Sequence, residues 1–139
     1  MKKFALLSIL FISVFTSCNL DDVDNNNYLG TEVLPIESVE MPEYFVIGET
    51  YEILITYERP SNCYQFYTFL YDIHENERTV AVVNAVYAND ACVEETESVT
   101  VSLDFRVTGT ETYLFKFYQG LDENGEELYY IVEVPVEEE

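Results

Sequence analysis

The chain beyond residue 30 predicts an all-β fold, a seven-stranded antiparallel sandwich. Apolar residues recur at every second position in several segments, and turn-forming residues separate these segments from one another. Nothing beyond the N-terminal apolar run looks like a helix of useful length. A chain that is 48% hydrophobic and 15% aromatic also has enough apolar material to form a core.

Alternation is clearest between residues 99 and 107, where Val, Leu and Phe alternate with Thr, Ser, Asp and Arg. Successive side chains of a strand point to opposite faces, so this pattern predicts one buried face and one wet face. The expected strands are residues 31–40, 51–57, 64–73, 79–87, 99–107, 113–117 and 128–136.

Two of these segments predict special positions in the sheets. Residues 64–73 are apolar on both faces, which predicts a central strand with cover on each side. Pro35 lacks the N–H that a strand ladder needs, so residues 31–40 are expected to form an edge strand.

The N-terminus has the features of an export signal. Lys2 and Lys3 precede an apolar run over residues 4–15, which is too short to span a bilayer. The following Thr16-Ser17-Cys18 resembles the lipobox of bacterial lipoproteins, although Phe15 stands where Leu is usual. This resemblance implies that Cys18 carries acyl chains that hold the protein on a membrane.

Residues 19–30 are polar and aperiodic, which predicts a flexible tether. The acidic Asp21, Asp22 and Asp24 resemble the surface-export signal of Bacteroidota lipoproteins, and a solvated linker is the alternative. The expected location is the outer membrane, with exposure at the cell surface as one orientation. The predicted organisation is a signal peptide at 1–17, lipidated Cys and tether at 18–30, and the sandwich at 31–139.

The charge limits the possible partners. Without residues 1–17 the chain keeps four basic residues against 27 acidic ones, a net charge of −23. Such a surface repels phosphate backbones, so nucleic acid is excluded as a partner. It also repels anionic headgroups, so membrane association must come from the acyl chains.

Once Cys18 is assigned to the lipid, Cys63 and Cys92 remain. An even number of cysteines in an exported chain predicts a disulfide. A closed loop of this size would stabilise the fold by about 3.5 kcal/mol. Two isolated cysteines without a nearby His are a poor metal site.

The segment from Thr108 to Phe115 resembles the start of strand F in immunoglobulin-like domains. The resemblance implies that Tyr113 is a structural corner whose hydroxyl bonds to upstream backbone, with Phe115 in place of the usual Cys. A Tyr that only packs in the core is the alternative. This topology would gather the loops after the second, fourth and sixth strands at one end, and so bring Cys63 near Cys92.

The residues do not predict an enzyme. His74 is the single His and lies in a turn context, and no G-x-S-x-G motif is present. If Cys63 and Cys92 are oxidised, neither of them can act as a nucleophile.

Calcium is the one candidate ligand, and no other cofactor is expected. Asp122, Asn124 and Glu126 offer hard oxygen ligands around Gly125, and Asp90 would lie at the same end of the sandwich. The spacing does not complete an EF-hand, and a hairpin turn with solvated carboxylates is the alternative.

Four tyrosines are candidates for exposed aromatic contacts with a sugar or a protein, or alternatively for packing within the sheets: Tyr67, Tyr71, Tyr118 and Tyr129. The sequence as a whole therefore predicts a non-catalytic, lipid-anchored envelope protein that acts as a binding or structural accessory module, with an envelope protein as its partner. Two alternatives stay open. One is a surface protein that binds calcium or another ligand through acidic loops, and the other is an enzyme of unrecognised type.

Overall fold

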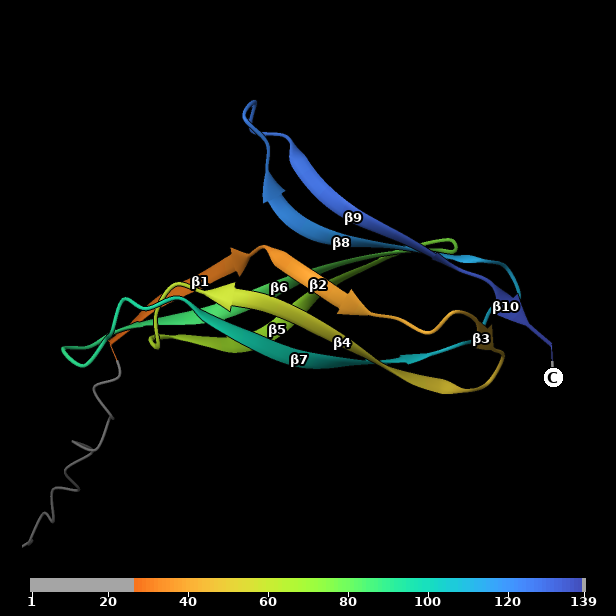
Figure 1. Cartoon of the computed structure of the whole chain (residues 1–139), viewed down its shortest axis with the longest axis horizontal. Coiled ribbons are helices and arrows are strands. Elements are labelled where there is room, and N and C mark those ends of the chain that lie inside the picture. Colours follow the sequence, from red (N-terminus) through yellow and green to blue (C-terminus); the bar gives the residue numbers. More distant parts are fainter. Residues whose placement is uncertain (1–26, 139) are drawn as a thin grey trace, which may run out of the picture.

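The computed structural model of the protein describes residues 27–138 (Figure 1). The predicted signal peptide, Cys18 and the first part of the tether lie outside the described residues. Residues 27–138 form ten strands and no helix, and none of them could cross a membrane as a helix. The strands are β1 (Asn27–Leu34), β2 (Ile36–Glu40), β3 (Phe45–Val46), β4 (Thr50–Arg59), β5 (Tyr64–His74), β6 (Glu77–Ala88), β7 (Glu97–Arg106), β8 (Tyr113–Leu121), β9 (Glu127–Val134) and β10 (Val136–Glu137).

Two sheets pack against each other and confirm the predicted all-β, sandwich-like fold. In the five-stranded sheet, β5 pairs with one side of β6, while β1 and β8 share its other side and β9 pairs with β8. The second sheet has the order β2-β4-β7, and β3 and β10 form a small pair of their own. β4 is therefore the inner strand of the smaller sheet, and β6 and β8 are the inner strands of the larger one.

The prediction of an entirely antiparallel sandwich is wrong. β6 runs parallel to β8, with Glu77–Val80 opposite Leu114–Phe117, and β10 runs parallel to β3. The parallel pair arises because the chain leaves β7 by the 107–112 connection and enters β8 beside the start of β6. The immunoglobulin topology predicted from the sequence is therefore not confirmed, because the larger sheet is mixed.

The expected edge strand at 31–40 is two strands in different sheets. Pro35 interrupts the ladder, and its neighbours Leu34 and Ile36 are both buried as the chain crosses from one sheet to the other. The ordered domain also begins earlier than residue 31. Asn27 to Gly30 of the predicted tether belong to β1, where the ring of Tyr28 packs on that of Tyr87 at 5.8 Å.

The prediction that residues 64–73 form a central strand is also wrong. β5 is an edge strand that pairs only with β6. Both faces of β5 carry apolar side chains although neither face is fully covered, since Phe66, Leu70 and Ile73 are all exposed. β5 thus has the composition of an interior strand although it pairs with only one other strand.

The core lies between β4 and β6 and extends to β8 and the short β3. Phe45, Phe105 and Phe115 form its aromatic centre, with ring centroids 5.1–6.1 Å apart. The buried hydroxyl of Tyr57 donates a hydrogen bond of 3.0 Å to Oδ1 of Asn84, so one polar pair crosses the core.

The predicted disulfide between Cys63 and Cys92 is confirmed, with a Cα–Cα distance of 5.5 Å. It joins the β4–β5 loop to the β6–β7 loop, and β1 begins at this same end because Asn27 lies opposite Ala88. The β8–β9 hairpin does not gather there. Its tip rises from the body of the domain on the side of β8 and β9, apart from the disulfide loops (Figure 1).

Candidate binding groove

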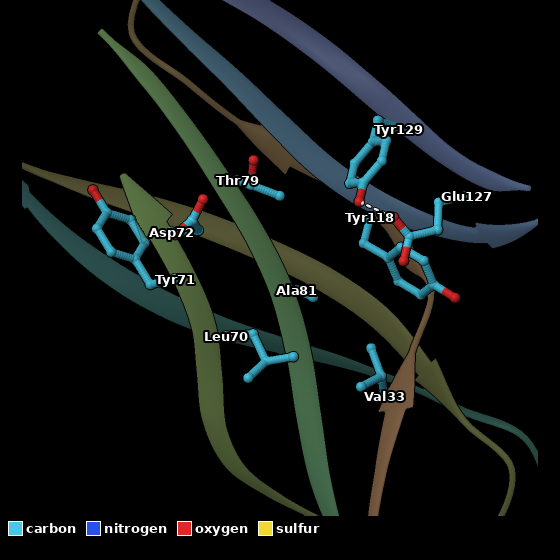
Figure 2. A pocket seen from close by; sticks show the side chains of 9 residues that line it. All are labelled: Val33, Leu70, Tyr71, Asp72, Thr79, Ala81, Tyr118, Glu127 and Tyr129. Atoms are coloured by element: carbon cyan, nitrogen blue, oxygen red, sulfur yellow. Dashed lines mark hydrogen bonds between the residues drawn. The ribbon is translucent and has the colours of Figure 1, made fainter. Parts of the chain in front are cut away.

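An open groove of about 390 Å³ lies on the outer face of the five-stranded sheet. β6 forms its floor, β5 forms one wall, and β8, β9 and β1 form the other, as Figure 2 shows. The groove is lined by Val33, Leu70, Tyr71, Asp72, Thr79, Ala81, Tyr118, Glu127 and Tyr129.

The groove follows from the side-chain pattern of β6. Thr79 and Ala81 point to the outer face because Val80 and Val82 face the core. The small Ala81 lies opposite Leu70 of β5. It also separates the part of β6 that pairs with β8 from the part that pairs with β1. A small residue between larger neighbours leaves a hollow along the middle strand.

Two tyrosines form the wall opposite β5. The ring centroids of Tyr118 and Tyr129 are 6.1 Å apart at an angle of 68°, and Nζ of Lys116 lies 4.8 Å from the centroid of Tyr129. Lys116 is also 3.1 Å from the carboxylate of Glu77, so a charge pair supports the aromatic wall from β6.

Tyr129 is fixed as a neutral donor. Its hydroxyl donates a 2.6 Å hydrogen bond to Oε2 of Glu127, drawn as a dashed line in Figure 2. This bond is the main cause that raises the pKa of Tyr129 to about 12, with further contributions from desolvation and from the negative charge of Glu127. Tyr129 therefore stays protonated at neutral pH, and its ring offers an uncharged surface.

Three of the four tyrosines that the sequence singled out line the groove, and two of them, Tyr118 and Tyr129, bring their rings together. The side chain of Tyr71 points away from the groove in Figure 2, and Tyr67 is exposed elsewhere on β5. Sequence reasoning missed Leu70 and Ala81. The sequence signal for the groove was the series of small residues at alternate positions between 79 and 85, which follows the bulky residues of 64–73.

Tyr113 makes the backward contact that the sequence predicted. Its buried hydroxyl accepts hydrogen bonds from the backbone N–H groups of Gly109 at 2.7 Å and Thr108 at 3.2 Å. Burial raises the pKa of Tyr113, but the donors from Gly109 and Thr108 and the nearby Arg78 outweigh it, so the pKa is lowered. Tyr113 is a structural residue and does not line the groove.

The calcium candidates do not meet at one place. Oδ1 of Asp122 accepts the N–H groups of Asn124 and Glu126, at 2.8 Å and 2.9 Å, within the β8–β9 turn. Asp90 lies in the β6–β7 loop, which Figure 1 shows far from that turn. Within residues 27–138 no three or more His, Cys, Asp and Glu side chains form a group that could hold a metal ion. Calcium binding stays a prediction.

His74 is exposed at the start of the β5–β6 turn, and Cys63 and Cys92 are bonded to each other. Comparison with known proteins adds no family to this description, since no family model, curated protein or solved structure matches the chain. The groove is therefore interpreted from its own residues. Its apolar floor and tyrosine wall are suited to contact with an apolar side chain or a flat ring, with Asp72 and Glu127 as polar groups at its margins.

Proposed function

We propose that this chain is a non-catalytic envelope protein, anchored by lipid at Cys18, whose domain binds a partner. The observation that carries the proposal is the groove on the outer sheet face, where the half-buried Tyr118 and Tyr129 face Leu70 across β6. Aromatic side chains with a polar end are common anchors in binding sites because they offer much contact area at little cost in entropy.

The remaining chemistry supports a binding role over a catalytic one. His74 lies in an exposed turn and the two cysteines of the domain are oxidised, so neither supplies a positioned base or nucleophile at the groove. The anchor rests on the resemblance of Thr16-Ser17-Cys18 to a lipobox. The net charge of −23 without residues 1–17 favours contact with a protein partner over contact with nucleic acid.

An immunoglobulin-like origin is the finer part of the proposal. It is supported by the hydrogen bonds of the Tyr113 hydroxyl and by the antiparallel pairing of β4 with β7. The parallel pairing of β6 with β8 departs from that topology.

The anchor is tested by growing the producing cells with a labelled fatty acid. The full chain should incorporate label into the protein, and Cys18→Ala should not. Label on the Cys18→Ala variant would refute the lipid anchor.

Binding is tested by crosslinking the protein in intact envelopes and comparing two variants for recovery of the same partner. Tyr129→Ala should lose the partner, because it removes half of the aromatic wall. Tyr130→Ala is the control, since the next residue of β9 is also a tyrosine and points to the other face. Equal recovery with both variants would reject the groove as the binding surface.

A further inference from the structure

One flank of the sandwich leaves core-facing side chains uncovered. Phe66, Tyr71 and Ile73 of β5 lie opposite Asn84, Val80 and Arg78 of β6, so they share the inward face of the sheet. They are nevertheless 39%, 39% and 61% exposed. We call these three residues, with the half-buried Val99, Val101 and Leu103 on the core-facing side of β7, the open flank.

β5 and β7 lie at the same side of the molecule. β1 and β8 occupy the side of β6 away from β5, and the side-chain amide of Gln119 in β8 donates to the carbonyl of Ile36 in β2, at 3.3 Å. β2 is one edge of its sheet, so the other edge, β7, falls on the β5 side. Arg59 confirms this, because its guanidinium bonds both to Glu97 of β7 and to the carbonyl of Tyr64 in β5.

β7 has the form of a strand ready to pair. It matches β4 at ten consecutive positions without a bulge, and the part of the chain that the structure describes places no strand on its other side. Natural edge strands are usually protected by Pro, Lys or a bulge. Residues 98–103 of β7 have none of these, whereas β5 is interrupted by a bulge between Phe66 and Thr68.

The outer face of β7 favours a basic neighbour. Asp104 lies directly opposite Glu52 of β4, and like charges at opposed positions of a sheet repel each other. A Lys or Arg on a strand added beside β7 would offset this repulsion. The net charge of −21 would also attract such a strand from solution.

The geometry points to strand addition: the free edge of β7 receives an extended strand of a basic partner protein. Its alternate apolar side chains cover Phe66, Tyr71 and Ile73, and its basic side chains lie beside Asp104. Main-chain hydrogen bonds along the edge supply affinity, and the alternation of apolar and basic residues supplies specificity. This inference concerns the face opposite to the groove and does not depend on it.

A second copy of this chain fits the site poorly. Each strand of residues 27–138 carries at most one basic residue. Of these residues, Arg59 is bonded to Glu97, and Lys116 to Glu77. Pairing two copies would also bring two strongly acidic domains together, so the required charge must come from another protein.

Fluorescent peptides as long as β7 test the inference directly on the full chain, purified in an uncharged detergent. One peptide alternates Val with Lys, and a control peptide of the same composition groups its Val residues in a block. The alternating peptide should bind at near-physiological salt and slow the hydrogen exchange of β7 amides, while the block peptide binds about tenfold more weakly. Equal binding of both peptides would mean bulk charge attraction only and would overturn the inference.

Matched variants locate the site. Ile73→Lys should weaken binding of the alternating peptide about tenfold, whereas Leu70→Lys, on the outer face of the same strand, should not. The two residues are similarly exposed, at 61% and 55%, so both variants should fold, which circular dichroism checks. Leu70→Lys alters the groove and leaves the open flank intact. If only this variant loses the crosslinked partner in envelopes, the groove and the open flank act separately, and failure of one proposal can be told from failure of the other.

The charge contribution is measured with Asp104→Asn, which should weaken binding about threefold, against Asp72→Asn on the outer face of β5, which should not. The inference would be overturned if the two variants of either matched pair weakened peptide binding equally. It would also be overturned if the peptide slowed hydrogen exchange in β9 and not in β7. Association of the chain with itself that Ile73→Lys abolishes would also overturn it, because the occupant would then be a second copy.

Discussion

The centre and the flank of this sandwich are built from the same residue types and differ in what covers them. Ile53 and Ile55 of β4 and Val80 and Val82 of β6 are fully buried between the sheets. Phe66 and Ile73 of β5 occupy equivalent inward positions and are exposed. The comparison teaches that alternation assigns a side chain to a face, while the number and order of strands decide whether that face is closed.

The largest expected difference between the two regions is in stability. Phe115→Ala should lower the free energy of unfolding by about 4 kcal/mol, because it opens a cavity among packed rings. Phe66→Ala should cost less than about 1 kcal/mol, because water already reaches this side chain. Denaturant titration of both variants checks this, and equal losses would show that the flank is as closed as the centre.

The disulfide should contribute the next largest effect. Cys63→Ser or Cys92→Ser should each lower stability by about 3.5 kcal/mol in the chain-entropy description. The bond lies just before β5 and just before β7, so its loss should loosen the flank strands more than β4 and β6. Thermal melting of the oxidised and reduced protein measures the effect, and identical melting temperatures would contradict it.

The hydroxyl of Tyr113 belongs to the closed region. Tyr113→Phe should cost about 1–2 kcal/mol, because the N–H groups of Thr108 and Gly109 lose their acceptor in a buried setting. Tyr129→Phe, in the open groove, should cost less than about 0.5 kcal/mol. Unfolding titrations measure the free energy of unfolding of the two variants. A larger loss for Tyr129→Phe than for Tyr113→Phe would contradict the placement of the Tyr113 hydroxyl in the closed region and of Tyr129 in the open one.

The smallest effect concerns pH. The pKa of Tyr129 is raised from 10.0 to about 12, so the folded state holds this proton more tightly than the unfolded state. The stabilisation is present below pH 10 and is lost as the pH rises towards 12. Burial raises the pKa of Tyr57 and Tyr71 as well, and the hydrogen bond to Glu32 raises the pKa of Tyr64. Ultraviolet titration should therefore show several late-ionising tyrosines, of which one moves to lower pH in Glu127→Gln. An unchanged titration in that variant would remove Glu127 as the cause.

The all-β fold and the bond between Cys63 and Cys92 could be predicted, because alternation and cysteine number act through local spacing and export chemistry. The backbone contact of Tyr113 could be predicted because the residues that it needs lie within five positions. The parallel pairing of β6 with β8 could not be predicted, since periodicity does not show which strands are neighbours.

The position of β5 at an edge shows the same limit. Its apolar residues on both faces are typical of a covered strand, but the structure leaves Phe66 and Ile73 exposed on one face and Leu70 on the other. The groove was only partly predictable. Tyr118 and Tyr129 could be named as candidate contact residues, but the hollow depends on Ala81, which lies between the part of β6 that pairs with β8 and the part that pairs with β1.

Residue-resolved hydrogen exchange of the free chain tests the central claim, that the sandwich is closed at its centre and open along β5 and β7. The amides of β4 and β6 that bond to neighbouring strands should exchange slowly, and the outward amides of β5 and β7 should exchange orders of magnitude faster. Uniformly slow exchange across all four strands would show that the flank is already covered and would contradict the account.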